Sequence, residues 1–334
     1  MAEPTIICLT PVKNEAWILD NFLKSASLWA DYIIIADQMS TDGSREIAQK
    51  YPKVILIDNN SETFNEPERQ KILINEARKI KGQRLLITLD ADEMFSPEIF
   101  HSLEWKKVLN SAPGTIIKFQ WANLLPDLKK MWYGYYFPWG YMDDGVEHTG
   151  ENKIHSARIP LSENHPIIEV KDFKVIHYQY VNWERMKSKH RYYQCLEVLN
   201  YPQKSTLDIF RQYHHMLAIP DEEFVQTPTT WFSGYEKREI NISAFQNEKN
   251  YWFDENVLNF LEKYGPNTFK ELNIWDKDWR ETARYYKKQN LEVFRDPRTI
   301  VDKLIQMWLL KTQKNHNNRI VRKIDKLIKK FLSY

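Results

Sequence analysis

The sequence has little of several features that define common protein classes. Only two of its 334 residues are cysteines, Cys8 and Cys195, which lie far apart in apolar segments. They predict neither a disulfide framework nor a cysteine zinc site, and a reducing cytoplasm suits them best. No run of about 18 apolar residues occurs, and the first residues lack the apolar region of an export signal. We therefore expect a protein that neither spans a membrane nor is exported by that route.

The sequence also has few glycines and a small net charge. The nine glycines form no G-x-G-x-x-G after the first expected strand and no Walker-type loop, which argues against a Rossmann dehydrogenase or a P-loop enzyme. No G-x-S-x-G or H-E-x-x-H motif occurs, so the commonest hydrolase signatures are missing. The formal net charge of +2 argues against nucleic acid as a partner. With 43% apolar residues, the chain can still bury a large core.

The first 90 residues alternate short apolar runs with helical patterns. The runs cover residues 5–10, 32–36, 54–57 and 84–89, and they predict a parallel sheet with right-handed crossovers. The loops that follow the strands of such a sheet gather along one edge. We therefore expect Pro11–Glu15, Asp37–Ser44 and Asp90–Glu93 to be neighbours in space.

The fourth run ends on three carboxylates in four residues, Asp90, Asp92 and Glu93. Two acids one residue apart at the end of a buried strand can both reach one hard divalent cation, at the edge where open α/β sheets bind ligands. The alternative is that Asp90 and Asp92 merely cap the turn before a helix that starts near Ser96. This motif alone leaves both interpretations open.

Four motifs in this order resemble those of family 2 glycosyltransferases: Thr10–Glu15, Ala36–Ser44, Arg69–Gln70 and Leu89–Glu93. The resemblance implies a GT-A fold, which is an α/β architecture with a Rossmann-like, mixed but mainly parallel sheet flanked by helices. It also implies a nucleotide-sugar donor, with a UDP-sugar favoured. A Mn²⁺ or Mg²⁺ ion on the aspartate motif and inversion at the anomeric carbon are further implications.

The same resemblance assigns roles to individual residues. The donor-nucleotide contacts that it implies are Pro11, Val12, Asn14, Glu15, Asp37, Gln38, Asp42, Arg69, Asp90 and Ala91. Asp90 and Asp92 would hold the metal, and His177, at the end of a later apolar strand, would close that site. Turn chemistry is the alternative role for Asp37 and Asp42, and a hydrogen-bonded core position is the alternative for His177. Lys153 and Arg158 are further candidates for phosphate contacts.

An aromatic segment, Met131–Tyr141, comes before a loop that is rich in acids. Aromatic faces stack on sugar rings, so Trp132 or Trp139 would line an acceptor cleft, while core packing is expected for most of the other rings. Candidates for a general base are Asp143, Asp144 and Glu147. We favour Asp144 because the adjacent glycine allows close backbone approach, with a solvated turn as the alternative for each acid.

The expected domain organisation has three parts. A GT-A domain covers residues 1–200, with a donor half at about 1–95 and an acceptor half at about 96–200. A mostly helical extension covers 201–310, and a basic amphipathic tail covers 311–334. The tail repeats apolar residues at helical spacing among lysines and arginines, so it fits either an anionic membrane surface or docking on the body of the protein.

The sequence therefore predicts a metal-dependent, inverting glycosyltransferase that moves a sugar to a hydroxyl of a glycan acceptor in cell-surface polysaccharide synthesis. The expected location is the cytoplasm, either free or peripheral on the inner face of the cell membrane. Two alternatives remain. A nucleotidyltransferase would use a similar sheet but would normally carry a glycine-rich basic loop after its first strand, and an idle carbohydrate-binding or scaffold protein would keep the fold without the chemistry.

Overall fold

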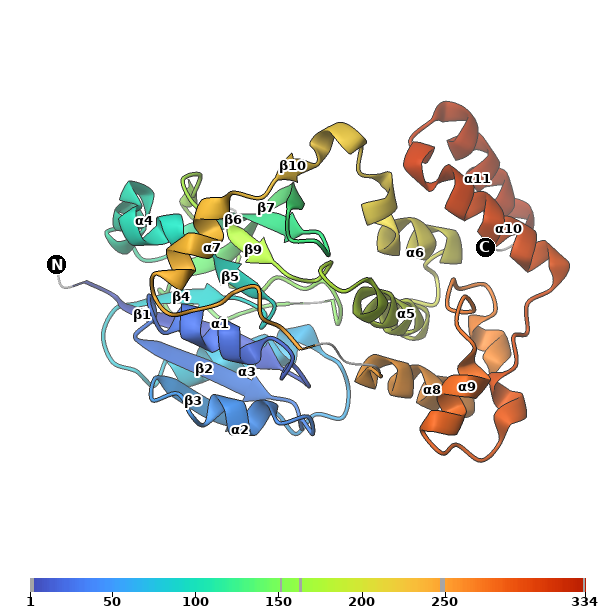
Figure 1. Ribbon diagram of the computed structural model, residues 1–334, viewed down its shortest axis with the longest axis horizontal. Coiled ribbons are helices and arrows are strands. Elements are labelled where there is room, and N and C mark those ends of the chain that lie inside the picture. The colour runs from blue at the N-terminus through green and yellow to red at the C-terminus, as the bar shows by residue number, and fades with distance from the viewer. Residues whose placement is uncertain (1–2, 151, 162–163, 247–249, 333) are drawn as a thin grey trace. The chain divides into compact units, whose positions relative to one another are not determined.

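The computed structural model describes residues 3–150, 152–161, 164–246, 250–332 and 334. These residues form two compact units (Figure 1). The first unit is Met1–Asn182 with Val225–Asn247, and the second is Trp183–Phe224 with Glu248–Tyr334. The division into 1–200, 201–310 and 311–334 stays a prediction, since compactness alone does not define functional domains.

The first unit alternates strands and helices from its beginning. Its strands are β1 (Thr5–Val12), β2 (Tyr32–Asp37), β3 (Val54–Asp58), β4 (Arg84–Thr88), β5 (Glu93–Phe95), β6 (Ile116–Leu124), β7 (Lys130–Met142), β8 (Ile167–Glu169), β9 (Val175–His177) and β10 (Val225–Gln226). Its helices are α1 (Leu19–Ala26), α2 (Ser44–Ala48), α3 (Glu66–Ala77), α4 (Leu103–Leu109) and α7 (Thr229–Glu236), with a 3₁₀ helix at Pro97–His101. The single helix expected near residues 97–110 is therefore two short helices, because Ser102 leaves the helical conformation and caps α4.

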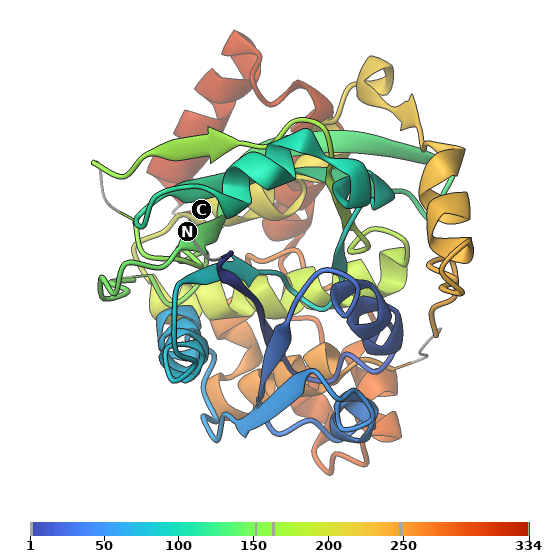
Figure 2. The ribbon, with the colours of Figure 1, turned by 90° about the vertical axis from the view of Figure 1, so that its left-hand side faces the viewer.

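Within the described residues, the strands form one sheet with the order β3-β2-β1-β4-β7-β6-β9-β5, while β8 pairs with β6 and β10 with β7. In Figure 2, α1 and α3 lie on opposite sides of the first strands. The first four strands are parallel, as the alternating pattern predicted. β7 runs antiparallel to both β4 and β6, and β5 runs antiparallel to β9. The expected α/β fold, with a mixed sheet and a mostly helical C-terminal part, is confirmed.

The sheet is buried on both faces, which explains why its central strands are continuous apolar runs. On one face Cys8, Ile33 and Ile87 pack against α1, in a core that extends to the aromatic rings of α4 and α7. On the other face the intervening residues, such as Leu9 and Leu86, pack against α3. Successive strand residues point to opposite faces, so the two cores interleave along each strand.

The second unit is helical. Its helices are α5 (Trp183–Asn200), α6 (Thr206–Tyr213), α8 (Trp252–Tyr264), α9 (Trp279–Tyr285), α10 (Ile300–Thr312) and α11 (Arg319–Leu332), with 3₁₀ helices at His215–Ala218, Asp221–Glu223, Pro266–Phe269, Leu291–Phe294 and Gln313–Asn315. Arg211 on α6 ties the last two helices together, because its guanidinium donates to Leu309 O at 2.9 Å and pairs with Asp325 at 3.0 Å. In the part of the chain that the structure describes, no helix is long and apolar enough to cross a bilayer.

Gly140 allows β7 to lie close to its neighbours. A Cβ atom at this position would lie 2.8 Å from Ile117 Cβ and 3.1 Å from Ile87 Cδ1. We therefore expect Gly140→Ala to lower the free energy of unfolding by about 1–3 kcal/mol through overpacking, measured by urea denaturation. An unfolding free energy equal to that of the wild-type protein would show that the strands can separate without cost.

Candidate active site

The three loops expected to be neighbours meet at one edge of the sheet. Val12 pairs with Asp37 at the ends of β1 and β2, and Leu9 pairs with Thr88 near the end of β4. Pro11–Glu15, Asp37–Ser44 and Asp90–Glu93 therefore all leave the sheet on the side of the carboxyl ends. In open α/β sheets this is the edge where ligands bind.

The first two loops hold each other through backbone-to-side-chain hydrogen bonds. Asn14 N donates to Ser40 Oγ at 2.8 Å, and Ala16 N donates to Asp42 Oδ2 at 2.8 Å. Asn14 has a positive φ of 55°, and its own Oδ1 accepts from Thr41 N at 2.7 Å. Asp42 and Asn14 are both predicted nucleotide contacts. Their side-chain oxygens instead accept hydrogen bonds that fix the shape of these loops.

Asp37 lies at the end of β2 and is almost completely buried. Its Oδ2 accepts from Arg45 Nη1 at 2.8 Å, and Arg45 also pairs with Asp58 at 2.8 Å. Its Oδ1, by contrast, is buried without a hydrogen bond in the described part of the protein. A carboxylate oxygen left in this way is costly, so it is suited to accept a hydrogen bond from a ligand.

Two other predicted nucleotide contacts, Gln38 and Arg69, lie in the loop after β2 and on α3. Gln38 donates its side-chain amide to Ser61 O at 2.7 Å and to Thr63 O at 3.1 Å, so it holds the loop after β3 in place. Arg69, in the first turns of α3, has its guanidinium 5.0 Å from the centre of the Phe64 ring. The Arg69 Nε is buried without a hydrogen-bond acceptor among the described residues. The positively charged guanidinium of Arg69 therefore keeps one N–H group that donates no hydrogen bond to the described residues.

Arg158 neutralises the carboxylates after β4. Its Nη2 donates to Asp90 Oδ2 at 2.6 Å, and its Nη1 donates to Glu93 Oε2 at 2.6 Å. Its guanidinium lies 4.7 Å from the centre of the Trp139 ring, a cation–π contact. Burial raises the pKa of Glu93 to about 7, and the positive charge of Arg158 opposes that shift. Trp121 Nε1 adds a hydrogen bond to Glu93 Oε1 at 3.0 Å.

Asp92 instead faces His177. Both residues are nearly fully buried, and Asp92 Oδ2 lies 3.9 Å from His177 Nε2. The other ring nitrogen, Nδ1, donates to Asn123 Oδ1 at 2.8 Å, and the imidazole stacks on the Trp121 ring with centroids 4.4 Å apart. Asn123 thus holds the second ring nitrogen of His177 through a hydrogen bond, an arrangement also found in many metal-ligating histidines.

The predicted metal-binding trio is therefore only partly assembled. Asp92 and His177 approach each other, while the Oδ2 atom of Asp90 is bonded to Arg158. Among residues 3–150, 152–161, 164–246, 250–332 and 334, no group of three or more His, Cys, Asp or Glu side chains is arranged to hold a metal ion. A cation bound here would take Asp92 and His177 from this chain, and the remaining positions would go to other oxygen donors.

The two tryptophans proposed for the acceptor cleft are both almost fully buried. Trp139 lies at the carboxyl end of β4, where Thr88 Oγ1 donates to its carbonyl. Its ring makes the cation–π contact with the Arg158 guanidinium. Trp132 packs against Tyr180, with ring centroids 4.6 Å apart. The aromatic segment is strand β7, and most of its rings take part in packing, as expected.

Two of the predicted general bases, Asp143 and Asp144, lie at the amino edge of the sheet. β7 is antiparallel to β4, so Met142 pairs with Leu85, and Asp143 N donates to Arg84 O at the amino end of β4. This end is about 20 Å from Asp90, given a rise of about 3.3 Å per strand residue. Asp143 and Asp144 therefore lie away from the carboxyl edge that they were expected to serve, and the assignment of Glu147 as a general base stays a prediction.

These acids have structural partners where they lie. Asp143 pairs with Arg78 at 2.8 Å and with Arg84 at 2.9 Å. Burial opposes its ionisation, but hydrogen bonds from both arginines and from the Gly145 backbone lower its pKa overall. Asp144 accepts from Tyr141 Oη and from Val146 N. Both side chains stabilise the turn after β7.

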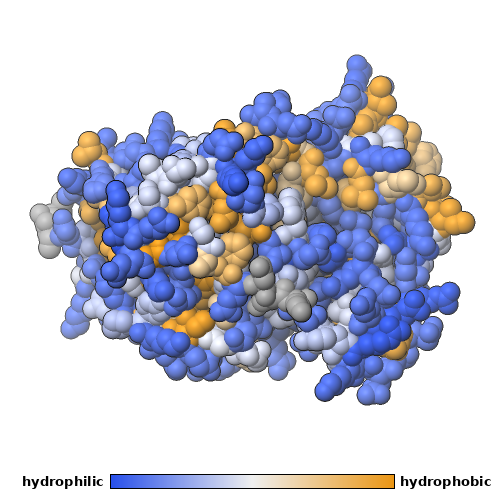
Figure 3. Space-filling model, in the orientation of Figure 1, coloured by the Kyte–Doolittle hydropathy of each residue, from blue (hydrophilic) through white to orange (hydrophobic). Residues whose placement is uncertain are grey.

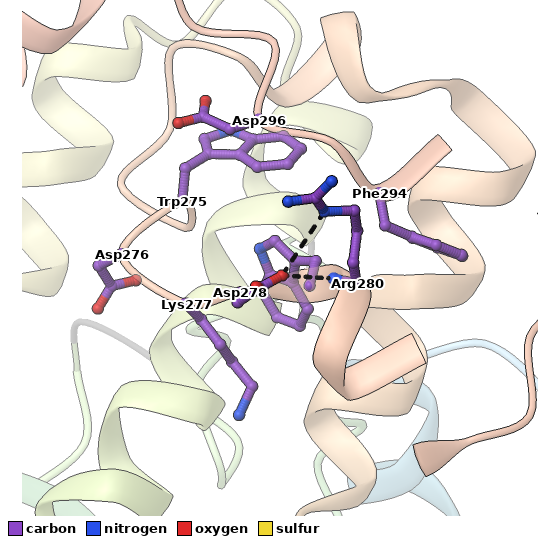
Figure 4. Close-up of a pocket in the computed structure, with 8 residues that line it drawn as sticks. Trp275, Asp276, Lys277, Asp278, Arg280, Phe294 and Asp296 are labelled. Atoms are coloured by element: carbon purple, nitrogen blue, oxygen red, sulfur yellow. Dashed lines mark hydrogen bonds and ion pairs between the residues drawn. The ribbon is translucent and has the colours of Figure 1, made fainter. Parts of the chain in front are cut away.

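The second unit contains a pocket of about 260 Å³ that holds none of the predicted site residues (Figure 4). Trp275, Trp279 and Phe294 line it with three aspartates, a lysine and an arginine. Asp296 is paired with Arg298 at 2.9 Å, and Asp278 caps α9. The described contacts give this pocket no convergent polar groups that would identify a ligand.

Comparison with known proteins finds a family similarity for part of the first unit. Residues 7–104 match the family model "Glycosyl transferase family 2". This span begins in β1, ends in α4, and includes all three loops together with Arg69. This part of the chain, which is less than a third of its length, is therefore similar to glycosyl transferase family 2.

Solved structures with partial similarity to the chain add little to this assignment. A glucosyl-3-phosphoglycerate synthase from Mycobacterium tuberculosis, in complex with Mn²⁺, UDP and glucosyl-3-phosphoglycerate, is 16% identical over 36% of this chain and 44% of its own, with a TM-score of 0.26. A mannosyl-3-phosphoglycerate synthase from Rubrobacter xylanophilus is 19% identical over 37% and 41%, with a TM-score of 0.28. The chain thus spans less than half the length of either protein, and such similarities carry no argument about substrates. No curated protein sequence matches the chain.

Three residues of the first unit have larger structural roles than the sequence indicated. Arg158 was a candidate only for phosphate, whereas Trp121 and Asn123 were not singled out at all. Both belong to β6, whose parallel pairing with β9 sets Asn123 beside His177. The sequence did indicate that some basic residue must play the part of Arg158, because three carboxylates in four residues at the end of a buried strand require a nearby cation.

The first prediction for this site concerns the acids after β7. We expect Asp144→Asn to change sugar transfer less than about twofold, because its carboxylate lies far from the carboxyl edge, whereas loss of a general base costs about 10²–10⁴-fold. Asp143→Asn should lower the melting temperature and leave the rate alone. Its pKa is lower in the folded state, so its stabilising contribution is complete above the ordinary pKa near 4 and is lost as the pH falls below it. A hundredfold loss of rate in Asp144→Asn would contradict the placement.

The second prediction concerns Arg158. Replacement by alanine leaves the fully buried Glu93 and the partly exposed Asp90 without their counter-charge, so the free energy of unfolding should fall by about 3–5 kcal/mol. The matched control is Arg280→Ala, because Arg280 and its partner Asp278 are both exposed, and such surface pairs contribute about 0–1 kcal/mol. Equal losses in the two variants, measured by urea unfolding, would show that Arg158 does not neutralise the site.

Proposed function

We propose that this protein is a glycosyltransferase that moves a sugar from a nucleotide-sugar donor to a hydroxyl of a glycan acceptor. The observation that carries the proposal is the match of residues 7–104 to glycosyl transferase family 2, together with the assembly of that span's motif loops at one sheet edge. A UDP-sugar donor, inversion of configuration and a role in cytoplasmic assembly of cell-surface polysaccharide belong to the same proposal.

The proposed donor site uses groups that the protein leaves unsatisfied. Asp37 Oδ1 would accept a hydrogen bond from the nucleoside, and Arg69, whose Nε has no acceptor among the described residues, would face the negative diphosphate. Arg158 would hold Asp90 in a fixed orientation beside the donor. These groups are fixed before the ligand arrives, which reduces the entropy lost on binding.

A divalent cation, Mn²⁺ or Mg²⁺, fits one position at this edge. His177 Nε2 lies 3.9 Å from the Asp92 carboxylate, and a cation would be favoured where an imidazole nitrogen and a carboxylate oxygen approach each other in a buried position. An oxygen and an imidazole nitrogen form an acceptable donor set for Mn²⁺. When bound, the ion would neutralise charge that develops on the departing diphosphate.

The test combines donor, metal and a conservative substitution. We expect UDP binding to the wild-type protein to be strengthened by Mn²⁺, and Asp92→Asn to abolish that gain while leaving the melting temperature of the apo protein nearly unchanged. Isothermal titration calorimetry measures both, and a panel of nucleotide-sugars in a thermal-shift assay then identifies the donor, since ligand at 100 times its Kd adds about 2.7 kcal/mol.

Asp127→Asn is the matched control, because Asp127 orders the exposed turn between β6 and β7 and should have no effect on donor binding. If Asp92→Asn binds UDP and Mn²⁺ as tightly as the wild-type protein, the metal position is wrong. If no nucleotide-sugar binds or reacts, the glycosyltransferase proposal fails, and an idle carbohydrate-binding protein of the same fold becomes the better explanation.

A further inference from the structure

The last two helices of the second unit expose an unusual amount of apolar surface. On α10 the side chains of Ile300, Leu304 and Met307 are exposed by 79%, 55% and 44%. On α11, Leu327 and Phe331 are exposed by 54% and 69%. Figure 3 shows hydrophobic side chains gathered over this part of the surface. Their spacing of three, four or seven residues places them on one face of each helix.

The opposite faces of both helices are already used for packing. Ile305 and Leu309 of α10 pack against Leu207 and Phe210 of α6, and Ile328 of α11 packs on the same cluster. Trp308 donates to Asp325 at 2.9 Å and links the two helices directly. The exposed stripes are therefore surplus to the fold of the unit, which does not need them for its own core.

Charge on these helices is divided in the same way. Residues 300–334 contain nine lysines and arginines and only two acids, Asp302 and Asp325. Both acids are buried, where Asp302 accepts from Tyr334 Oη at 2.6 Å and Asp325 pairs with Arg211 at 3.0 Å. The outward faces thus carry positive charge without an acid of their own to balance it.

Several of these cations border the apolar stripes. They are Lys311 on α10 and Arg319, Lys323, Lys326 and Lys330 on α11, and all five side chains are exposed. None of the five makes an ion pair among the residues that the structure describes. Long basic side chains can lay their methylene groups along an apolar surface and keep their charges at headgroup level.

We propose that α10 and α11 together form a docking surface for an anionic lipid bilayer. The apolar stripes enter the boundary between headgroups and acyl chains, and the flanking lysines and arginines meet lipid phosphates. A second copy of the same face is a poor occupant because it would bring the two sets of positive charges together. The surface lies on the bilayer and does not cross it, and it is independent of the sugar-transfer chemistry.

Vesicle co-sedimentation of the full chain tests the proposal. The protein should pellet with vesicles of phosphatidylcholine and phosphatidylglycerol, much less with phosphatidylcholine alone, and less as salt is raised. The double variants Leu304→Gln with Leu327→Gln, and Lys323→Glu with Lys330→Glu, should each weaken binding to the anionic vesicles by about tenfold or more. All four positions are exposed, so the fold should be retained, as a circular dichroism melt would show.

Matched controls come from α4 in the first unit. Leu103, which is 69% exposed, is replaced by glutamine, and the exposed Lys106 and Lys107 are replaced by glutamate, with no expected loss of pelleting. The two native cysteines are buried, so a polarity-sensitive thiol dye can be attached at Leu327→Cys. Its emission should shift to the blue with anionic vesicles, and a dye at Leu103→Cys should not respond.

Three results would overturn the proposal. The first is a wild-type protein that stays in the supernatant with anionic vesicles. The second is a pair of double variants that pellet as well as the wild-type protein. The third is a wild-type dimer in analytical ultracentrifugation that dissociates on substitution of Leu304 and Leu327, because a second copy would then cover this face.

Discussion

The ion-pair network around Arg158 is the interaction on which the proposed site depends. The buried end of β4 carries Asp90, Asp92 and Glu93, and three carboxylates so close together are unfavourable in a low-dielectric position without a cation. Arg158 bonds two of them, at 2.6 Å each, and leaves Asp92 to face His177. The network therefore separates the acids into a pair that Arg158 bonds and a third, Asp92, that approaches His177.

The same network fixes the segment that supplies the arginine. Ser156 N donates to Glu66 Oε2 at 2.7 Å, and Glu66 N donates to Lys153 O at 3.0 Å, so this segment is attached to the first turn of α3. Arg69 also lies in that first turn of α3. The cation at the β4 edge and the cation on α3 are consequently positioned by one set of contacts, which is why a change at Arg158 should affect more than Asp90.

Residues within one sequence motif have divided roles in the structure. In the loops after β1 and β2, Asn14, Asp42 and Gln38 use their polar groups to bond neighbouring backbone, whereas Asp37 keeps one buried oxygen unsatisfied. The sequence allowed either a turn-forming role or a binding role for these residues. In the structure, some of them form the turns, and Asp37 is left as the candidate for binding. The second unit shows a comparable division, because Asp302 and Asp325 face its interior and the lysines of α11 face outward.

The sequence by itself determined the parallel strands β1 to β4 and the edge at which their loops meet, since apolar runs and strand ends are local features. It could not determine the direction of β7, because alternation along a strand is the same whichever way the strand runs. Antiparallel pairing with β4 therefore carried Asp143 and Asp144 to the opposite edge. The contacts of Arg158 and Asn123 were likewise decided only by tertiary structure, since they join residues separated by more than 50 positions along the chain.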